Sequence, residues 1–147
     1  MPDRRTLVLS LRPRYAHAIL DGTKTVELRK RRVAASPGTD LILYATTPMR
    51  AVVGTARLQG TILCEPEAAW REHAASLGLE RHEFERYLAG VTMACLLLLE
   101  NVRRLQRPLS LAELTRTDSF RPPQSYRYVS SADPAGIRDL LPGRESA

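Results

Sequence analysis

Two long apolar segments constrain the fold more than any other feature of the chain. The segment 51–64 is β-like throughout, and Gly54 and Gly60 interrupt it where a strand would bend or bulge. The segment 91–106 is apolar as far as Leu99 and then alternates apolar and polar residues, as a core strand does. Long strands with glycine bends are typical of a small, strongly curved sheet, so we expect a β-barrel.

Shorter segments complete this barrel and define one α+β domain. Periodicity and turn residues predict further strands at residues 6–11, 24–29, 41–46 and 124–129, and helices at residues 13–21, 65–76, 79–88, 109–114 and 134–141. The expected architecture is a mixed barrel of five to six strands with helices inserted between them. We expect a single domain over residues 1–147, with its core at about 5–130 and a C-terminal helix and loose tail at 131–147.

Three residues predict element boundaries near the C-terminus. Pro108 is expected to end the strand at 91–106. Ser110 should cap the helical turn at 109–114, with Glu113 at the capping-box position. Asp133 should cap the last helix.

The chain is basic, and this favours a polyanionic partner such as RNA, DNA or a nucleotide. The net charge is +6, yet 20 of the 22 basic residues are arginine, a bias that a GC-rich genome also produces without selection for binding. Clustering is more informative than the total. Seven basic residues fall within 21 positions that hold only two acids, which favours a binding role for this cluster. The alternative to binding is a solvated charged face. These residues are Arg12, Arg14, Lys24, Arg29, Lys30, Arg31 and Arg32.

Other classes of protein find little support in the sequence. The longest apolar run, residues 93–99, is too short to span a membrane, and residues 1–5 lead into a strand without a secretory signal. Cys64 and Cys95 lie in apolar segments and resemble small buried hydrophobes of a reducing cytoplasm. The three histidines are scattered, so we expect no metal, no cofactor, no membrane partner and a cytoplasmic location.

The segment Gly22–Arg29 carries the strongest indication of a site. Gly22 is expected to end a short helix, after which the apolar positions switch to the period of a strand. Alternation then places Thr25, Glu27 and Arg29 on one face, with Lys24 at its entrance. Two cations and a carboxylate in six residues favour an anionic or polar ligand.

The same segment resembles the signature of the ASCH domain, G-x-K-x-x-E-x-R. The residues that carry the resemblance are Ser10–Pro13, Tyr15–Ala16, Ile19–Leu20, Gly22–Arg29, Leu41–Ala45 and Ala51–Gly54, with Gln124–Tyr128 similar to an aromatic-basic segment near the end of many members. The resemblance is strongest over residues 6–60 and extends to about 130. It implies a barrel like that of the PUA RNA-binding domain, a cleft beside the signature, and a role linked to RNA or modified nucleosides.

The resemblance also implies possible catalysis. Some ASCH members are ribonucleases, and some small ones are amidohydrolases that remove the acetyl group of acetylated cytidine. In those amidohydrolases the signature lysine, here Lys24, is catalytic, but the position three residues later is threonine, whereas here it is Glu27. They also use a glutamate in the helical region, which no single residue matches; the candidates are Glu72, Glu80, Glu83 and Glu85.

Three functions therefore stay open: an RNA- or nucleotide-binding module, which we favour; a metal-independent hydrolase of RNA or a modified nucleoside; and a small-molecule-sensing regulatory domain. In a hydrolase, Glu27 would be the general base and Lys24 and Arg29 would stabilise developing negative charge. Position 24 holds one of only two lysines in the chain, which suggests an amine of lowered pKa. The alternative is a Lys24–Glu27 ion pair that only orders the strand.

A binding module would use more of the chain than the signature. Cations would hold phosphate, Glu27 would accept from a base edge, and Tyr126 or Tyr128 would stack a base of single-stranded nucleic acid. The oligomeric state stays open. The candidate nucleic-acid-binding residues are Ser10, Arg12, Thr25, Lys30, Arg31, Arg32, Gln124, Ser125, Tyr126 and Arg127.

Overall fold

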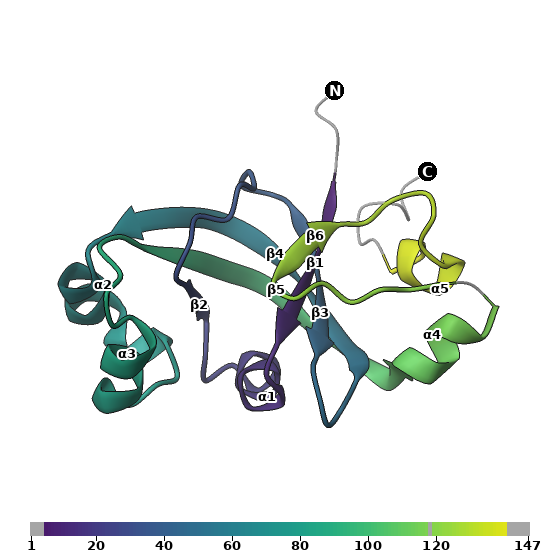
Figure 1. Cartoon of the computed structure of the whole chain (residues 1–147), viewed down its shortest axis with the longest axis horizontal. Helices are drawn as coiled ribbons and strands as arrows, with labels where there is room; N and C mark the ends of the chain where they lie inside the picture. Colours follow the sequence, from purple (N-terminus) through teal and green to yellow (C-terminus); the bar gives the residue numbers. More distant parts are fainter. Residues whose placement is uncertain (1–4, 118, 141–147) are drawn as a thin grey trace.

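A six-stranded mixed sheet forms the body of the protein in the computed structural model, which describes residues 5–117 and 119–140. Its order is β2-β5-β4-β3-β1-β6; β1 runs parallel to β3, and every other neighbouring pair is antiparallel (Figure 1). The strands are β1 (Thr6–Leu11), β2 (Val26–Arg29), β3 (Asp40–Ala45), β4 (Ala51–Cys64), β5 (Ala94–Ser110) and β6 (Tyr126–Tyr128). The predicted α+β barrel is confirmed as a curled half-barrel, with β2 and β6 as its edges.

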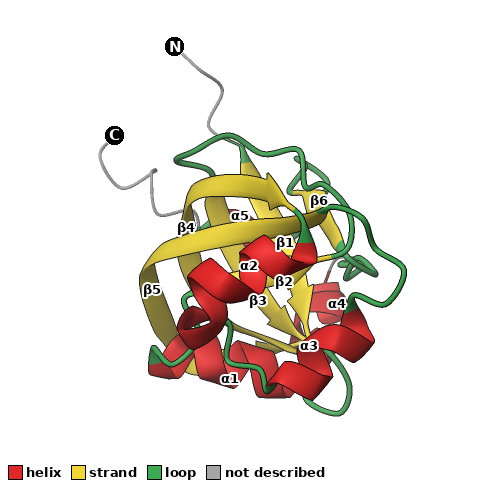
Figure 2. Cartoon of the chain, turned by 90° about the vertical axis from the view of Figure 1, so that its left-hand side faces the viewer, coloured by secondary structure: helices red, strands yellow, loops and turns green. Residues whose placement is uncertain are grey.

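The two long strands curve around the barrel, as Figure 2 shows. The β4–β5 register shifts between Val52 and Gly54, between Thr55 and Arg57, and between Leu58 and Gly60, so that two of the three shifts fall at the predicted glycines. A Cβ at Gly54 would lie 2.6 Å from the backbone oxygen of Arg103, so only glycine allows this close approach of the strands. The bulges let this long antiparallel strand pair bend across the whole sheet.

The end of β5 differs from the sequence prediction. The strand continues to Ser110 instead of ending before Pro108. Its register jumps between Arg104, which pairs with Gly54, and Leu109, which pairs with Val52. Pro108 falls in this irregular stretch, where its missing N–H costs no ladder hydrogen bond. Ser110 does cap a helix, accepting a 3.1 Å hydrogen bond from the Glu113 N–H, but that helix runs from 111 to 117 rather than from 109 to 114.

The helices lie at both ends of the sheet and beside its middle. Figure 1 shows α2 and α3 at one end next to β2, α4 and α5 at the other, and α1 between them. The structure assigns α1 (Pro13–Asp21), α2 (Pro66–His73), a 3₁₀ turn η1 (Ala74–Ser76), α3 (Arg81–Tyr87), α4 (Leu111–Thr117) and α5 (Ala135–Arg138). We call residues 66–87, which join β4 to β5, the helical insertion. In the part of the chain that the structure describes, no helix is long and apolar enough to cross a membrane.

Apolar clusters on both faces of the sheet fix the direction of each side chain of β2. Val26 and Leu28 pack with Leu77 and Phe84 in the cluster beneath the helical insertion. Glu27 pairs with Leu97, which belongs to the main cluster on the other face, where α1 packs. The pleat therefore directs Glu27 away from the helical insertion and toward the interior of the half-barrel.

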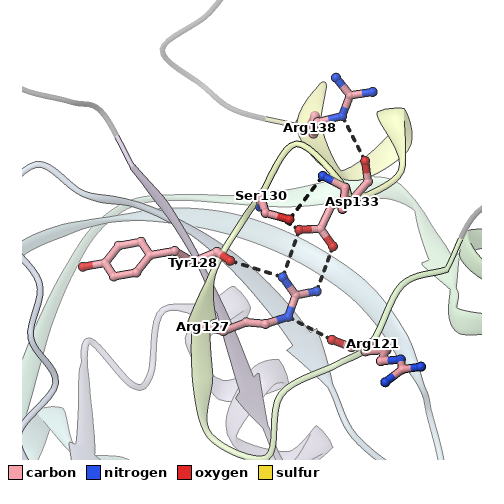
Figure 3. A network of polar contacts seen from close by, with 7 residues as sticks. Arg121, Arg127, Tyr128, Ser130, Asp133 and Arg138 are labelled. Atoms are coloured by element: carbon pink, nitrogen blue, oxygen red, sulfur yellow. Dashed lines mark hydrogen bonds and ion pairs between the residues drawn. The ribbon is translucent and has the colours of Figure 1, made fainter.

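A polar network secures the C-terminal segment beside β6 (Figure 3). Arg127 donates to both carboxylate oxygens of Asp133, at 2.8 and 2.9 Å, and to the backbone oxygen of Arg121 at 3.0 Å. The Ser130 N–H also donates to Asp133, at 2.8 Å. Asp133 is thus not the predicted helix cap. The helix α5 begins at Ala135 with Pro134 at its N-cap position and no side-chain cap, while the Asp133 carboxylate binds the guanidinium of Arg127. Residues 141–147, which include the end of the predicted helix and tail, lie outside the described residues.

We expect Asp133→Ala to lower the free energy of unfolding by about 2 kcal/mol at neutral pH, because Arg127 loses its carboxylate. Burial raises the pKa of Asp133, but the hydrogen bonds from Arg127 and Ser130 outweigh it and set the pKa below its ordinary value of 3.8. A lowered carboxyl pKa stabilises the fold above pH 3.8, and this contribution is lost as the pH falls through the folded-state pKa. Urea unfolding at several pH values measures the difference.

The control for this prediction is Glu100→Ala. It removes a carboxylate whose ion pair with Arg57 is 3.8 Å long and solvent-exposed, so we expect a change below about 0.5 kcal/mol. Equal losses in the two variants, or a loss at Asp133 that persists unchanged below the folded-state pKa, would contradict the prediction.

Candidate functional site

A cavity of about 280 Å³ opens where the end of β1, β2, α1 and the helical insertion meet. We call it the seam cavity, because it lies between β2 and β1 on the open side of the half-barrel. It is lined by Ser10, Leu11, Arg12, Tyr15, Lys24, Glu27, Leu28, Arg29, Thr46, Leu79, Tyr87 and Gln124. The signature lysine, glutamate and arginine are all in this set, so the structure brings them together at one cavity.

Lys24 lies at the inner wall of the cavity, whereas the sequence predicted that it would lie at the entrance. Gly22, with φ of 84°, ends α1, and the N–H groups of Thr23 and Lys24 both donate to the Ala18 oxygen at 3.1 Å. This tight turn directs the lysine beneath the helical insertion, where it is 1% exposed. Its Nζ donates to the backbone oxygen of Leu77 at 2.6 Å and lies 3.5 Å from Glu27 Oε1.

Burial lowers the pKa of the Lys24 amine. Removal from water is the largest cause, the carboxylate of Glu27 opposes it, and the charges of Arg29 and Arg14 add to it. The Nζ also lies 5.1 Å from the centre of the Tyr15 ring, which stabilises the ammonium form. The amine is therefore protonated less readily than an exposed lysine, and such a shift is frequent at functional sites.

Gly78 is the residue of the helical insertion that lets Lys24 be buried. Its φ is +66°, and a Cβ there would lie 3.1 Å from Lys24 Cβ. We expect Gly78→Ala to lower the free energy of unfolding by about 2 kcal/mol, through backbone strain and contact with the lysine stem. Gly90→Ala is the matched control, because φ is +80° and the described residues leave open space around its Cβ. Thermal melts measure both, and equal losses would mean that the contact with Lys24 contributes nothing.

Arg29 closes the seam between β2 and β1. Its Nη2 donates to the Ser10 oxygen in β1 at 2.9 Å, and its Nη1 donates to Ser125 Oγ, just before β6, at 3.1 Å. Its Nε lies 2.9 Å from Glu27 Oε2, within ion-pair distance, but makes no aligned hydrogen bond to any described residue. Glu27 is 6% exposed and lies between the two cations. One guanidinium therefore joins β2, β1 and the segment before β6.

The convergence of Lys24, Glu27 and Arg29 is compatible with both interpretations of the sequence, an ion pair that orders the strand and a site that binds a ligand. The first interpretation is an ion pair between Lys24 and Glu27 that only orders the strand, and this pair is present at 3.5 Å. The Lys24, Glu27 and Arg29 side chains are all largely engaged with the protein. The adjoining cavity nevertheless leaves room for a ligand beside them. The buried cluster can thus both order the strand and present charge to a guest.

The structure divides the candidate nucleic-acid-binding residues between two adjacent cavities. Ser10, Arg12 and Gln124 line the seam cavity. A second cavity of about 510 Å³, which we call the basic cavity, is lined by Arg29, Lys30, Arg31, Arg32, Val33, Tyr87, Gln124, Ser125 and Tyr126. Thr25 lines neither; its side chain is exposed, and its N–H donates to the Ser76 oxygen at 3.0 Å. Arg127 also lies outside both cavities and is engaged by Asp133.

The glutamates of the helical insertion do not reach the site. Among the described residues that line the two cavities, none is Glu72, Glu80, Glu83 or Glu85. Glu83 instead binds both terminal nitrogens of Arg14 in α1, and these hydrogen bonds lower its pKa to about 2. This pair tethers the helical insertion to α1. Within residues 5–117 and 119–140, no three His, Cys, Asp or Glu side chains are grouped as metal ligands.

Tyr15 and Tyr87 line the seam cavity, although the sequence did not identify either as a candidate site residue. Tyr87 is 37% exposed, donates to the Leu28 oxygen at 3.4 Å, and has the Lys30 Nζ 5.0 Å above its ring. Helical periodicity does not separate an aromatic residue of the core from one that lines a cavity. The helix carrying Tyr87 meets β2 only in the tertiary structure.

Comparison with known proteins supports one family. The ASCH domain family model matches residues 9–108. An ASCH domain-containing ribonuclease of Zymomonas mobilis is 32% identical over 130 residues, which cover 88% of this chain and 87% of that protein. The crystal structure of ASCH from Zymomonas mobilis matches with a TM-score of 0.84 at 30% identity, over 95% of this chain and 97% of that one. A tyrosine-to-phenylalanine variant from the same organism matches with a TM-score of 0.83 at 28% identity, over 94% and 99%. The chain therefore belongs to the ASCH domain family.

Proposed function

We propose that this protein binds single-stranded RNA, with one nucleoside in the seam cavity and phosphate groups along the basic residues 29–32. The observation that carries the proposal is the composition of the seam cavity. It combines the cations Lys24 and Arg29, the acceptor Glu27, and the aromatic rings of Tyr15 and Tyr87. Unpaired bases are recognised in proteins by aromatic stacking together with hydrogen bonds to their edges.

The size of the cavity favours one nucleoside over a larger ligand. At about 280 Å³ it is slightly below the usual range of ligand pockets, which begins at about 300 Å³. A double helix has its bases paired and stacked, so a base must be unpaired to enter. The Glu27 carboxylate is an acceptor for an exocyclic amine or a ribose hydroxyl, and Arg29 is a donor for phosphate.

A second candidate function is metal-independent cleavage of the bound RNA, which the 32% identity to a protein named a ribonuclease favours. In this reaction the 2′-oxygen attacks the neighbouring phosphorus while Glu27 takes the 2′-hydroxyl proton. The bond from phosphorus to the 5′-oxygen breaks, and the Lys24 ammonium protonates that oxygen. The products are a 2′,3′-cyclic phosphate and a 5′-hydroxyl, and Arg29 stabilises the charge on the phosphoryl oxygens.

The other two functions open from the sequence have less support. The acetylcytidine amidohydrolases use a glutamate of the helical region, and none of the four candidates lines either cavity among the described residues. A small-molecule sensor is compatible with the seam cavity but leaves the basic cavity beside it unused.

The test is an RNA-binding and cleavage assay in EDTA. A fluorescein-labelled single-stranded decamer is titrated with the wild-type protein, Glu27→Gln and the control Glu100→Gln, and the same mixtures are run on a denaturing gel. Thermal melts show whether each variant is folded. We expect saturable binding that Glu27→Gln weakens by about tenfold, equivalent to about 1.4 kcal/mol, and that Glu100→Gln leaves unchanged.

Cleavage adds a second readout to the same assay. Products that end in a 2′,3′-cyclic phosphate, lost in Glu27→Gln and kept in Glu100→Gln, support the ribonuclease. A decamer of 2′-O-methyl nucleotides should then bind without being cleaved, because it lacks the nucleophile. Absence of any binding at low salt would contradict both functions.

A further inference from the structure

The basic cavity adjoins the seam cavity and shares a wall with it. Arg29, Tyr87 and Gln124 line both. These three side chains therefore lie where the two cavities meet. The distance from one nucleoside of a strand to the next is bridged by one phosphodiester group, which is the part of RNA that a guanidinium binds best.

The basic cavity also gathers adjacent cations that no carboxylate of a described residue neutralises. Its residues 29–32 are all basic, and no described acidic residue lines it. Lys30, Arg31 and Arg32 make no ion pair within residues 5–117 and 119–140. Six arginines elsewhere do have carboxylate partners, namely Arg14, Arg57, Arg81, Arg104, Arg107 and Arg127. Three adjacent cations without an ion pair to the described part of the chain therefore favour a phosphate at this cavity, because its binding releases their counterions.

The shared wall is built for a phosphate with a base on each side. Bonds to Ser10 and Ser125 fix the guanidinium of Arg29, and its buried Nε faces Glu27 Oε2 at 2.9 Å. The Lys30 ammonium lies 5.0 Å from the centre of the Tyr87 ring, a cation–π contact at a face that a stacking base can also use. Tyr126 provides a second aromatic ring in the basic cavity.

We propose that the basic cavity is a second nucleotide subsite, so that the smallest ligand to fill the site is a dinucleotide whose phosphodiester lies against Arg29. This inference rests on the proposed RNA binding and adds to it a two-nucleotide footprint. Arg31 and Arg32 contact the second nucleotide and its outer phosphate and make no contact with the first.

Isothermal titration calorimetry with small probes tests the two subsites separately. The probes are the four ribonucleoside 5′-monophosphates and the 2′-O-methyl dinucleotides UpU and ApA carrying a 5′-phosphate, which lack the hydroxyl needed for cleavage. We expect the better dinucleotide to bind about tenfold or more tightly than the best monophosphate, because it adds a charged contact and a stacked base.

A pair of double variants assigns that gain to the basic cavity. Arg31→Gln with Arg32→Gln should bring the dinucleotide affinity to within about threefold of the monophosphate affinity of the wild-type protein. The control, Arg103→Gln with Arg104→Gln, removes an equal number of positive charges from β5. It should leave the dinucleotide and monophosphate affinities unchanged. A dinucleotide that binds no better than the monophosphate, or equal losses in both double variants, overturns the second subsite while RNA binding stands. If no probe and no longer RNA binds, the proposed function fails with it.

Discussion

Replacing Lys24 by methionine is expected to lower the free energy of unfolding by about 2 kcal/mol, although methionine fills most of the space of the lysine stem. The variant leaves the Leu77 oxygen without its 2.6 Å donor and removes one of the two cations beside the buried Glu27. Arg29 still faces the carboxylate at 2.9 Å, so the loss stays below that of a fully unpaired buried charge. The lowered pKa of Lys24 makes the expected loss of stability smaller still, because burial of the ammonium offsets part of the stabilisation that its contacts provide.

Lys30 provides the matched control, because it is the other lysine of the chain and is exposed. Lys30→Met should change the free energy of unfolding by less than about 0.5 kcal/mol in urea titrations. Combining Lys24→Met with Glu27→Gln should recover part of the loss, since the carboxylate no longer needs a cation. If Lys24→Met is as stable as the wild type, the lysine does not hold the helical insertion against the half-barrel.

Arg29→Lys is expected to weaken RNA binding by about tenfold and to lower the midpoint of thermal unfolding, although the charge is kept. The two bonds come from separate terminal nitrogens of the guanidinium, Nη2 to the Ser10 oxygen and Nη1 to Ser125 Oγ, and the point-like ammonium of lysine lacks this planar fork. The seam between β2 and β1 then loses its bridge, and both proposed subsites lose their shared donor. Fluorescence anisotropy and calorimetry measure the two effects.

Arg57→Lys is the control for this prediction. Arg57 is exposed on β4, and its only ion pair among the described residues is the long one to Glu100. The same substitution there should change RNA affinity by less than about twofold. Similar affinities in Arg29→Lys and the wild type would place the RNA away from the seam.

Local pattern predicted the geometry of β2 because that geometry is local. Gly22 supplies the left-handed residue that ends α1, and the period of a strand then sets Glu27 and Arg29 on one face. The glycine bulges of β4 were predictable for the same reason, because a glycine inside a long apolar strand usually marks a bulge or a close approach of two backbones.

What the sequence did not predict depends on residues far apart in the chain. Lys24 is buried because Leu77 and Gly78, more than 50 positions later, cover it. Arg127 carries a guanidinium, a group that often binds phosphate, yet Asp133 engages it after the chain turns at Ser130. In both cases the partner of a charged side chain comes from tertiary packing, which periodicity does not report.

Lysine NMR measures the central claim, that a nucleotide occupies the cavity beside Lys24. With ¹³C-labelled lysine the protein gives signals from only two side chains, and Lys30→Arg assigns them. The Lys24 Cε signal should titrate below the ordinary pKa of 10.5, and a nucleoside monophosphate should shift it saturably at physiological salt. A Lys24 signal that no nucleotide or short RNA moves, while Lys30 shifts only at low salt, would show that nucleic acid binds the outer surface and leaves the cavity empty.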